Sequence, residues 1–225
     1  MARTVPRVVA IGLPVLLVAC LQQSWEQYME AAAFAYQDEA FEEAEQWYLT
    51  AETKARTFPD DDPRLAITLG NLADLYHAQA RDRDAEPLYE EALDRLQRIE
   101  GADSPRVARF AADLAIFYTA LDRPEEAEPL YRQALETLDW ALGPYHRDVV
   151  LLRTAFAGFY LGEGRYAEAD PLYREVLAIL RSTAGADQDH LLTALDEYAT
   201  LLRATGRDAE AEAASAEAGA IRGAR

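Results

Sequence analysis

AEPLYEEAL (residues 85–93), AEPLYRQAL (127–135) and ADPLYREVL (169–177) stand 42 residues apart along this chain. A second block precedes each of them at the same step: NLADLYHAQAR from residue 71, DLAIFYTALDR from 113 and AFAGFYLGEGR from 155. Because two separate blocks keep one spacing, the sequence contains an internal repeat. A repeat of this length indicates an array of small, similar structural units.

Each repeat predicts a pair of amphipathic helices. Leu69, Leu72, Ala73 and Tyr76 follow an i, i+3, i+4, i+7 spacing, which places them on one apolar stripe of a helix. A similar stripe begins at Ala85 in the following helix. Polar residues that accept hydrogen bonds from free N–H groups stand at predicted helix starts: Ser24, Asp62 and Ser104. One such hairpin cannot bury both stripes, so we expect consecutive hairpins to stack on one another.

The pattern resembles the tetratricopeptide repeat, in the 42-residue variety found in kinesin light chains and many bacterial proteins. That variety carries LA-x-LY in the first helix and GR-x-x-EAEPLYRRAL across the turn, followed by a connector. GADSPRVA (101–108) and GPYHRDVV (143–150) are close relatives of this connector. The resemblance implies an all-α fold, a right-handed α-solenoid of about five tetratricopeptide-like helical hairpins.

We expect the repeat domain to occupy residues 24–225. Its units are expected at about 24–58, 63–100, 105–142, 147–184 and 189–222. In the last unit Ala214 and Ser215 replace the expected leucine and tyrosine, as suits a terminal unit whose outer side faces water.

The N-terminal segment predicts export. Arg3 and Arg7 precede a run of twelve apolar residues, 8–19, which is too short for a bilayer span of about 20 residues but matches a secretory signal. Residues 17–20, Leu-Val-Ala-Cys, resemble a bacterial lipobox and contain the only cysteine, Cys20. The resemblance implies a signal peptide at 1–19, acylation of Cys20, and a short lipid tether at 20–23. Two alternatives remain: a buried or incidental cysteine, and an uncleaved anchor that holds a cytoplasmic domain.

Leu21 follows the cysteine, and no aspartate is present there to favour retention in the inner membrane. The expected location is therefore the periplasmic face of the outer membrane, lipid-anchored, or the cell-surface membrane if the cell is Gram-positive.

Charge limits the partners. The chain has 40 acidic and 22 basic side chains, a formal net charge of −18. This balance opposes nucleic-acid binding, which depends largely on Lys and Arg that neutralise phosphates, and it disfavours anionic lipid headgroups as partners of the folded body. It favours a basic or amphipathic protein segment as partner, although acidic residues also serve solubility.

In the tetratricopeptide family, the first helix of each unit lines a concave surface that receives a peptide or helix of a partner protein. The resemblance therefore points to positions on those helices outside the apolar stripe: Asp74, His77, Arg109, Asp113, Ile116, Thr119, Thr154, Gly158, Leu161, Asp196, Thr200 and Arg203. Gly158 either leaves a gap for a partner's side chain or is a tolerated helical glycine.

The sequence favours no catalytic site. His77, His146 and His190 are widely separated and form no metal-ligand spacing. No serine lies in a GxSxG motif, and no glycine-rich phosphate loop is present. We predict that the chain is not an enzyme and uses no metal and no cofactor.

The predicted function is that of a lipid-anchored, extracytoplasmic scaffold that binds partner proteins, in the assembly of an envelope, secretion or pilus complex. The alternatives are a cytoplasmic adaptor in signalling or regulation, and a self-associating structural protein.

Overall fold

The computed structural model describes residues 24–183 and 187–223. The predicted signal peptide, the tether and the lipidation site at Cys20 lie outside the described residues, so they stay predictions. The described residues form ten α-helices and no strand. In chain order these are α2 (Trp25–Gln37), α3 (Phe41–Ala55), α4 (Arg64–Ala78), α5 (Asp82–Glu100), α6 (Pro105–Ala120), α7 (Pro124–Leu142), α8 (Arg147–Gly162), α9 (Tyr166–Ser182), α10 (Gln188–Ala204) and α11 (Asp208–Gly223).

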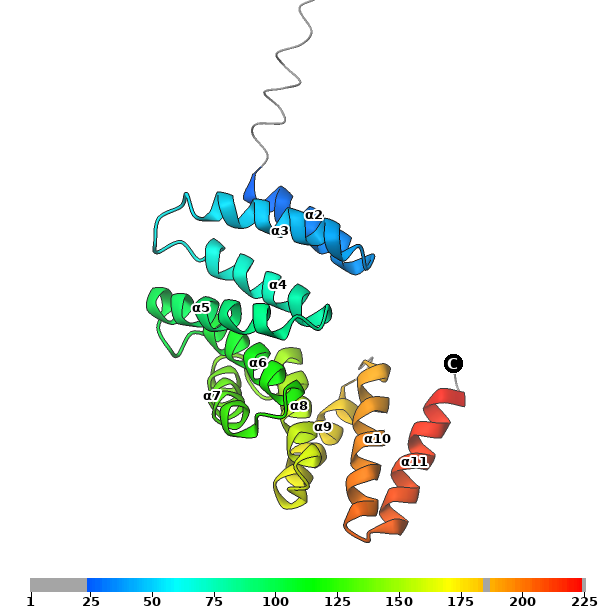
Figure 1. Cartoon of the computed structure of the whole chain (residues 1–225). Helices are drawn as coiled ribbons and strands as arrows, with labels where there is room; N and C mark the ends of the chain where they lie inside the picture. The colour runs from blue at the N-terminus through cyan, green and yellow to red at the C-terminus, as the bar shows by residue number, and fades with distance from the viewer. Residues whose placement is uncertain (1–23, 184–186, 224–225) are drawn as a thin grey trace, which may run out of the picture. The chain divides into compact units, whose positions relative to one another are not determined.

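Consecutive helices pair along the chain into five hairpins, from α2 with α3 to α10 with α11 (Figure 1). The predicted all-α fold of about five helical hairpins is confirmed. The described part of the chain divides into a first unit, residues 24–92, and a second unit, residues 93–223. The boundary falls inside α5, so the start of that helix belongs to the first unit and its end to the second.

The core of the first unit contains both small and large residues. Ala44 and Ala73 are fully buried, and Tyr48 and Leu72 are almost fully buried. Burial raises the pKa of the Tyr48 hydroxyl to about 12. The indole N–H of Trp25 donates a 2.8 Å hydrogen bond to Oγ1 of Thr68, which ties α2 to α4.

Of the capping residues expected from the sequence, Ser24 and Ser104 cap their helices, whereas Pro63 stands at the N-cap of α4 and Asp62 before it accepts from the N–H of Arg64 at 2.9 Å. Ser24 forms a full capping box with Gln27: the Ser24 N–H donates to Oε1 of Gln27, and the Gln27 N–H donates to Oγ of Ser24. Ser104 caps α6, where its Oγ accepts from the N–H of Arg106. His146 caps α8 in the same manner through Nδ1, which accepts from the N–H of Asp148.

The second unit buries more aromatic surface. Tyr131 and Tyr173 are almost completely buried, and the Tyr131 ring stacks on Phe156 with ring centres 5.1 Å apart. The last helix, α11, buries only alanines, at 211, 214 and 218. Because this terminal helix has few large apolar side chains, exposing its other side to water costs little free energy.

One polar contact recurs where consecutive hairpins meet, and we call it the carboxylate–tyrosine–arginine clamp. In the first unit, the Tyr76 hydroxyl on α4 donates to Oε1 of Glu45 on α3 at 3.0 Å. Nη1 of Arg81, in the turn after α4, donates to the other oxygen of Glu45, also at 3.0 Å. The Arg81 guanidinium lies 4.0 Å from the centre of the Tyr76 ring, so it forms a cation–π contact as well.

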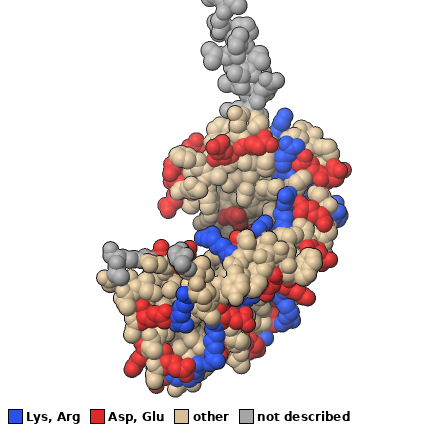
Figure 2. Space-filling model, turned by 180° about the vertical axis from the view of Figure 1, so that it is seen from behind, with Lys and Arg blue, Asp and Glu red and all other residues tan. Residues whose placement is uncertain are grey.

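The second unit contains the clamp between α7 and α8. The Tyr160 hydroxyl donates to Oε1 of Glu128 at 3.1 Å, and Arg165 donates to Oε2 of Glu128 at 2.5 Å. The Arg165 guanidinium lies 4.5 Å from the centre of the Tyr160 ring. Figure 2 shows Lys and Arg side chains in blue among acidic side chains in red over the face that it draws.

A third clamp joins α9 and α10. Asp170 on α9 accepts hydrogen bonds from the Tyr198 hydroxyl at 3.1 Å and from Nη1 of Arg207 at 2.6 Å. Each clamp therefore connects a carboxylate of one hairpin to a tyrosine and an arginine of the next. The sequence predicted that the tyrosine rings pack in the core, but it did not predict this use of their hydroxyl groups.

The backbone of the turn explains why the arginine reaches its own tyrosine. The residue before each of these arginines has a positive φ: 56° at Ala80, 67° at Gly164 and 72° at Gly206. This left-handed residue turns the chain back, and the N–H of Arg81 donates to the carbonyl oxygen of Tyr76 at 2.8 Å. In the first two clamps the guanidinium thereby lies over the tyrosine ring near the end of the preceding helix.

The charge of Glu128 should stabilise the second unit. Hydrogen bonds from Arg165 and Tyr160 hold the pKa of Glu128 below its ordinary value of 4.5. We expect Glu128→Gln to lower the free energy of unfolding by about 1 kcal/mol at neutral pH. Since a lowered carboxyl pKa stabilises the fold above the unfolded value, the difference should disappear as the pH falls through the lowered folded value.

Urea unfolding of both chains at neutral pH and at about pH 3 measures this difference. Glu125→Gln is the matched control, because Glu125 is exposed on the same helix and forms no ion pair among the described residues. Equal stability of Glu128→Gln and wild type at neutral pH would contradict a stabilising clamp.

Candidate protein-binding groove

A cavity of about 360 Å³ lies in the second unit between α6 and α8, and we call it the groove. Its lining comes from α6, from α8 and from one residue of α7: Arg109, Ala112, Asp113, Ile116, Leu138, Asp148, Leu151, Leu152 and Ala155. Three of the residues predicted from the sequence, Arg109, Asp113 and Ile116, are brought together here.

Two apolar side chains of the groove lining are exposed to solvent, although other apolar side chains of the lining are buried. Ile116 is 46% exposed and Leu151 is 37% exposed, whereas Leu152 beside them is 4% exposed. An exposed pair on neighbouring helices offers a partner apolar surface that the fold itself does not cover.

Charges surround this apolar surface. Nε of Arg109 on α6 lies 2.8 Å from Oδ2 of Asp148 on α8, so an ion pair links the two helices. Both side chains are partly exposed, and such a pair stabilises a fold by no more than about 1 kcal/mol. With Asp113 also on the lining, the groove has two carboxylates and one guanidinium.

Other predicted residues of the second unit lie outside the groove lining. The Thr119 hydroxyl donates to the carbonyl oxygen of Ala115 at 2.8 Å, and Thr154 is buried, with its hydroxyl 2.8 Å from Nε2 of His190. Leu161 is half-buried. A Cβ atom at Gly158 would meet the Tyr173 hydroxyl at 3.7 Å, so this tyrosine occupies the space beside the glycine.

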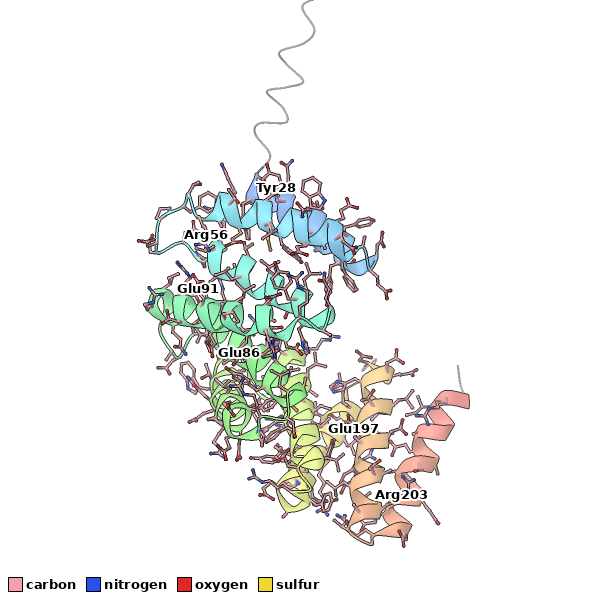
Figure 3. The ribbon with its side chains drawn as sticks, in the orientation of Figure 1. Tyr28, Arg56, Glu86, Glu91, Glu197 and Arg203 are labelled. Atoms are coloured by element: carbon pink, nitrogen blue, oxygen red, sulfur yellow. The ribbon has the colours of Figure 1, made fainter. Side chains whose placement is uncertain are left out.

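The predicted residues of α10 interact with α11 or with their own helix. Asp196 forms an ion pair with Arg222, and Nη2 of Arg203 donates to Oγ of Ser215 at 2.6 Å. The hydroxyl of Thr200 donates to the carbonyl oxygen of Asp196 at 3.0 Å. Figure 3 labels Arg203 and Glu197 on this helix.

The first unit holds the remaining two predicted residues, on α4. Oδ1 of Asp74 accepts a 2.5 Å hydrogen bond from the Tyr89 hydroxyl, and Nδ1 of His77 lies 2.7 Å from Oδ1 of Asp82. Burial raises the pKa of Asp74, against the opposing effects of the Tyr89 hydroxyl and of His77. A partner-binding role for these residues stays a prediction.

Sequence reasoning missed several groove residues and one buried acid. Leu151 and Leu152 belong to a helix that is apolar on most sides, so the sequence pattern did not show which of its residues are exposed and which are buried.

Glu197 on α10 is half-buried, and its carboxylate accepts a hydrogen bond from the Tyr173 hydroxyl at 3.2 Å. Burial raises the pKa of Glu197.

Within residues 24–183 and 187–223, no group of three or more His, Cys, Asp or Glu side chains is arranged to hold a metal ion. None of the helices in the same ranges has the length and apolar character that a membrane span needs.

Comparisons with known proteins agree with the repeat. A family model described as Tetratricopeptide repeat matches residues 27–98, 83–139 and 148–222, well over half of the chain. No curated protein matches the sequence significantly.

Solved structures share the fold. BtubC (BKLC) from P. vanneervenii superposes with a TM-score of 0.82 at 26% identity, over 94% of this chain and 83% of that one. A putative kinesin light chain of Podosopora anserina with nearly identical TPR-like repeats gives 0.75 at 23% identity, over 88% and 94% of the two chains. The MamA protein gives 0.58 at 16% identity, over 88% and 91%. The predicted similarity to tetratricopeptide repeats of the kinesin-light-chain kind is confirmed.

Glu197→Gln should stabilise the protein at neutral pH, the opposite of Glu128→Gln. The pKa of Glu197 is raised above its ordinary 4.5, so ionising this carboxyl costs more free energy in the folded chain than in the unfolded one. The resulting loss of stability grows as the pH rises from 4.5 to the raised folded value. The amide is neutral, and its oxygen can still accept from Tyr173. We expect a higher midpoint of thermal unfolding at pH 7 and no difference from wild type at about pH 4. A lower midpoint at pH 7 would show that the carboxylate charge is favourable there.

Proposed function

We propose, since this chain belongs to the tetratricopeptide repeat family, that it is a scaffold which holds a segment of a partner protein in the groove between α6 and α8. Repeats of this family in general form non-enzymatic scaffolds for protein–protein interaction. The observation that carries the proposal is the exposed apolar pair, Ile116 and Leu151, beside a cavity of about 360 Å³.

The lining indicates the chemistry of the partner segment. An apolar side chain of the partner fits between Ile116 and Leu151, where it loses contact with water. The lining has two carboxylates, Asp113 and Asp148, against the single guanidinium of Arg109, and the whole chain has a net charge of −18. An amphipathic segment with basic residues beside its apolar anchor therefore suits the groove best.

We place this scaffold at a membrane through lipids on Cys20, on the periplasmic face of the outer membrane. Support for this location comes from the sequence: the short apolar run and the lipobox-like residues 17–20. The tether at 20–23 is short, and four residues extend to no more than about 14 Å. A partner would thus have to be in that membrane or come to it, which agrees with a role in assembling an envelope, secretion or pilus complex.

Capture of a partner in the groove should depend on its apolar surface. With the photoreactive residue p-benzoylphenylalanine in place of Leu151, irradiation of cells should give a discrete crosslinked adduct. Ile116→Asp in the same chain should reduce the adduct about tenfold, because it puts a charge where an apolar side chain binds. Immunoblotting of the adduct measures this.

Two controls make that result specific. Ala167→Asp adds the same charge at an exposed position of α9 outside the groove, and it should leave the adduct unchanged. The photoreactive residue at Arg132, 65% exposed on α7, should give no such adduct. An adduct insensitive to Ile116→Asp would rule the groove out as the binding surface.

Lipid anchoring is tested separately. Metabolic labelling with palmitate should label the wild-type chain, and Cys20→Ala should abolish the label and release the chain from the membrane fraction. A chain that carries no Cys20-dependent label and fractionates with the cytosol would instead favour the cytoplasmic adaptor.

A further inference from the structure

A second surface lies on the opposite side of α7 from its buried stripe. Trp140 is 86% exposed, an unusual state for a tryptophan. It shares one helix face with three polar residues at i, i+3, i+4 and i+7 spacing: Gln133, Glu136, Thr137 and Trp140 itself. With Asp103, from the loop between α5 and α6, these residues line a cavity of about 440 Å³, which we call the Trp140 pocket.

The carboxylates of this pocket have no cation of their own. Among the described residues, neither Asp103 nor Glu136 lies within ion-pair distance of a basic side chain, although many carboxylates of the same unit do. Two unpaired carboxylates beside one exposed indole ring form a site that attracts a positive charge.

The preceding repeat has a paired acid at these positions. Asp94 and Arg98 on α5 lie 42 residues before Glu136 and Trp140. There Nη2 of Arg98 donates to Oδ2 of Asp94 at 2.6 Å, so the carboxylate is paired within its own helix. In α7 the acid is kept, but tryptophan takes the place of the arginine. At that point α7 therefore has an exposed aromatic ring where α5 has the cation that pairs with its acid.

The helix turn that carries Trp140 is firmly held. The neighbouring Asp139 accepts a 2.8 Å hydrogen bond from Nη2 of Arg153, a residue of α8 that is only 3% exposed. Nε of Arg153 also lies 3.3 Å from Oε2 of Glu175 on α9. Because three helices meet at this guanidinium, the backbone of the last turn of α7, which carries Trp140, is held in place without a binding partner.

We propose that the Trp140 pocket binds an arginine side chain from a segment of a partner protein, on a surface separate from the groove. The planar guanidinium stacks on the indole ring and at the same time donates to the carboxylates of Glu136 and Asp103. It supplies the cation that Arg98 supplies in the preceding repeat. Lysine offers only a point charge and cannot match both the ring plane and the carboxylates.

The test uses the full chain in detergent with its indole nitrogens labelled with ¹⁵N. The probe is a capped peptide of alternating arginine and glycine, and its control has citrulline, which is planar but uncharged, in place of each arginine. The arginine peptide should shift the Trp140 indole resonance saturably, and more than those of Trp25 and Trp47. The spectrum of Trp140→Leu assigns the resonance. The citrulline peptide should leave it unchanged.

Variants separate this pocket from the general acidity of the chain. Glu136→Gln should weaken the apparent affinity for the arginine peptide about fivefold. Glu125→Gln, which removes the same charge near the start of the same helix, should change it by less than about twofold. Trp140→Arg restores the arrangement of α5 and should abolish the calorimetric signal of binding, with an unchanged circular dichroism spectrum.

Several outcomes would overturn the proposal. An equal shift with the citrulline peptide, or equal losses in Glu136→Gln and Glu125→Gln, would mean that the pocket does not recognise arginine. A Trp140 shift that depends on protein concentration without peptide would assign the surface to a second copy of the chain. A shift with phosphatidylcholine added to the detergent micelles and none with the arginine peptide would assign it to a lipid headgroup.

Discussion

Buried tyrosine hydroxyl groups require hydrogen-bond partners, and for Tyr76, Tyr160 and Tyr198 the partner comes from the adjacent hairpin. The ring of Tyr160 packs in the core of the second unit, and its hydroxyl finds an acceptor in Glu128 of the preceding hairpin. Arg165 then neutralises the same carboxylate and covers the ring. An isolated hairpin would leave the tyrosine without its acceptor and the apolar stripe without its cover, so hairpins are stable only in contact with neighbours.

The repeat fixes the helices and leaves single positions free to differ. Asp74, Ile116 and Gly158 stand at the same position of successive first helices, 42 residues apart. Asp74 accepts a hydrogen bond from Tyr89, Ile116 is exposed in the groove, and Gly158 lies beside the Tyr173 hydroxyl. The same position of the repeat thus has a different side chain and different contacts in each unit. Such substitutions can change the binding surface without changing how the hairpins pack.

The fold was predictable because its determinants are local and periodic: the apolar stripes, the Ser24 capping box and the alanines that let helices approach. The groove was predictable in part, since Arg109, Asp113 and Ile116 follow from the register of α6. The position of Leu151 in the groove could not be predicted, because α8 contacts α6, α7, α9 and α10 and is apolar on most sides. The burial of Arg153 likewise depends on Asp139 and Glu175, contacts across helices that no single-helix pattern reveals.

Pairing of charges inside the molecule determines where a charged partner can bind. An arginine four residues after an acid on the same helix, as in Glu52–Arg56 and Asp94–Arg98, satisfies the carboxylate without help from outside. A partner that approached such a pair would have to displace the arginine, and it would gain little. Glu136 lacks that neighbour, so a guanidinium that arrives there displaces only water. Departures from the repeat, more than the net charge of −18, therefore mark the places where this scaffold can distinguish one partner from another.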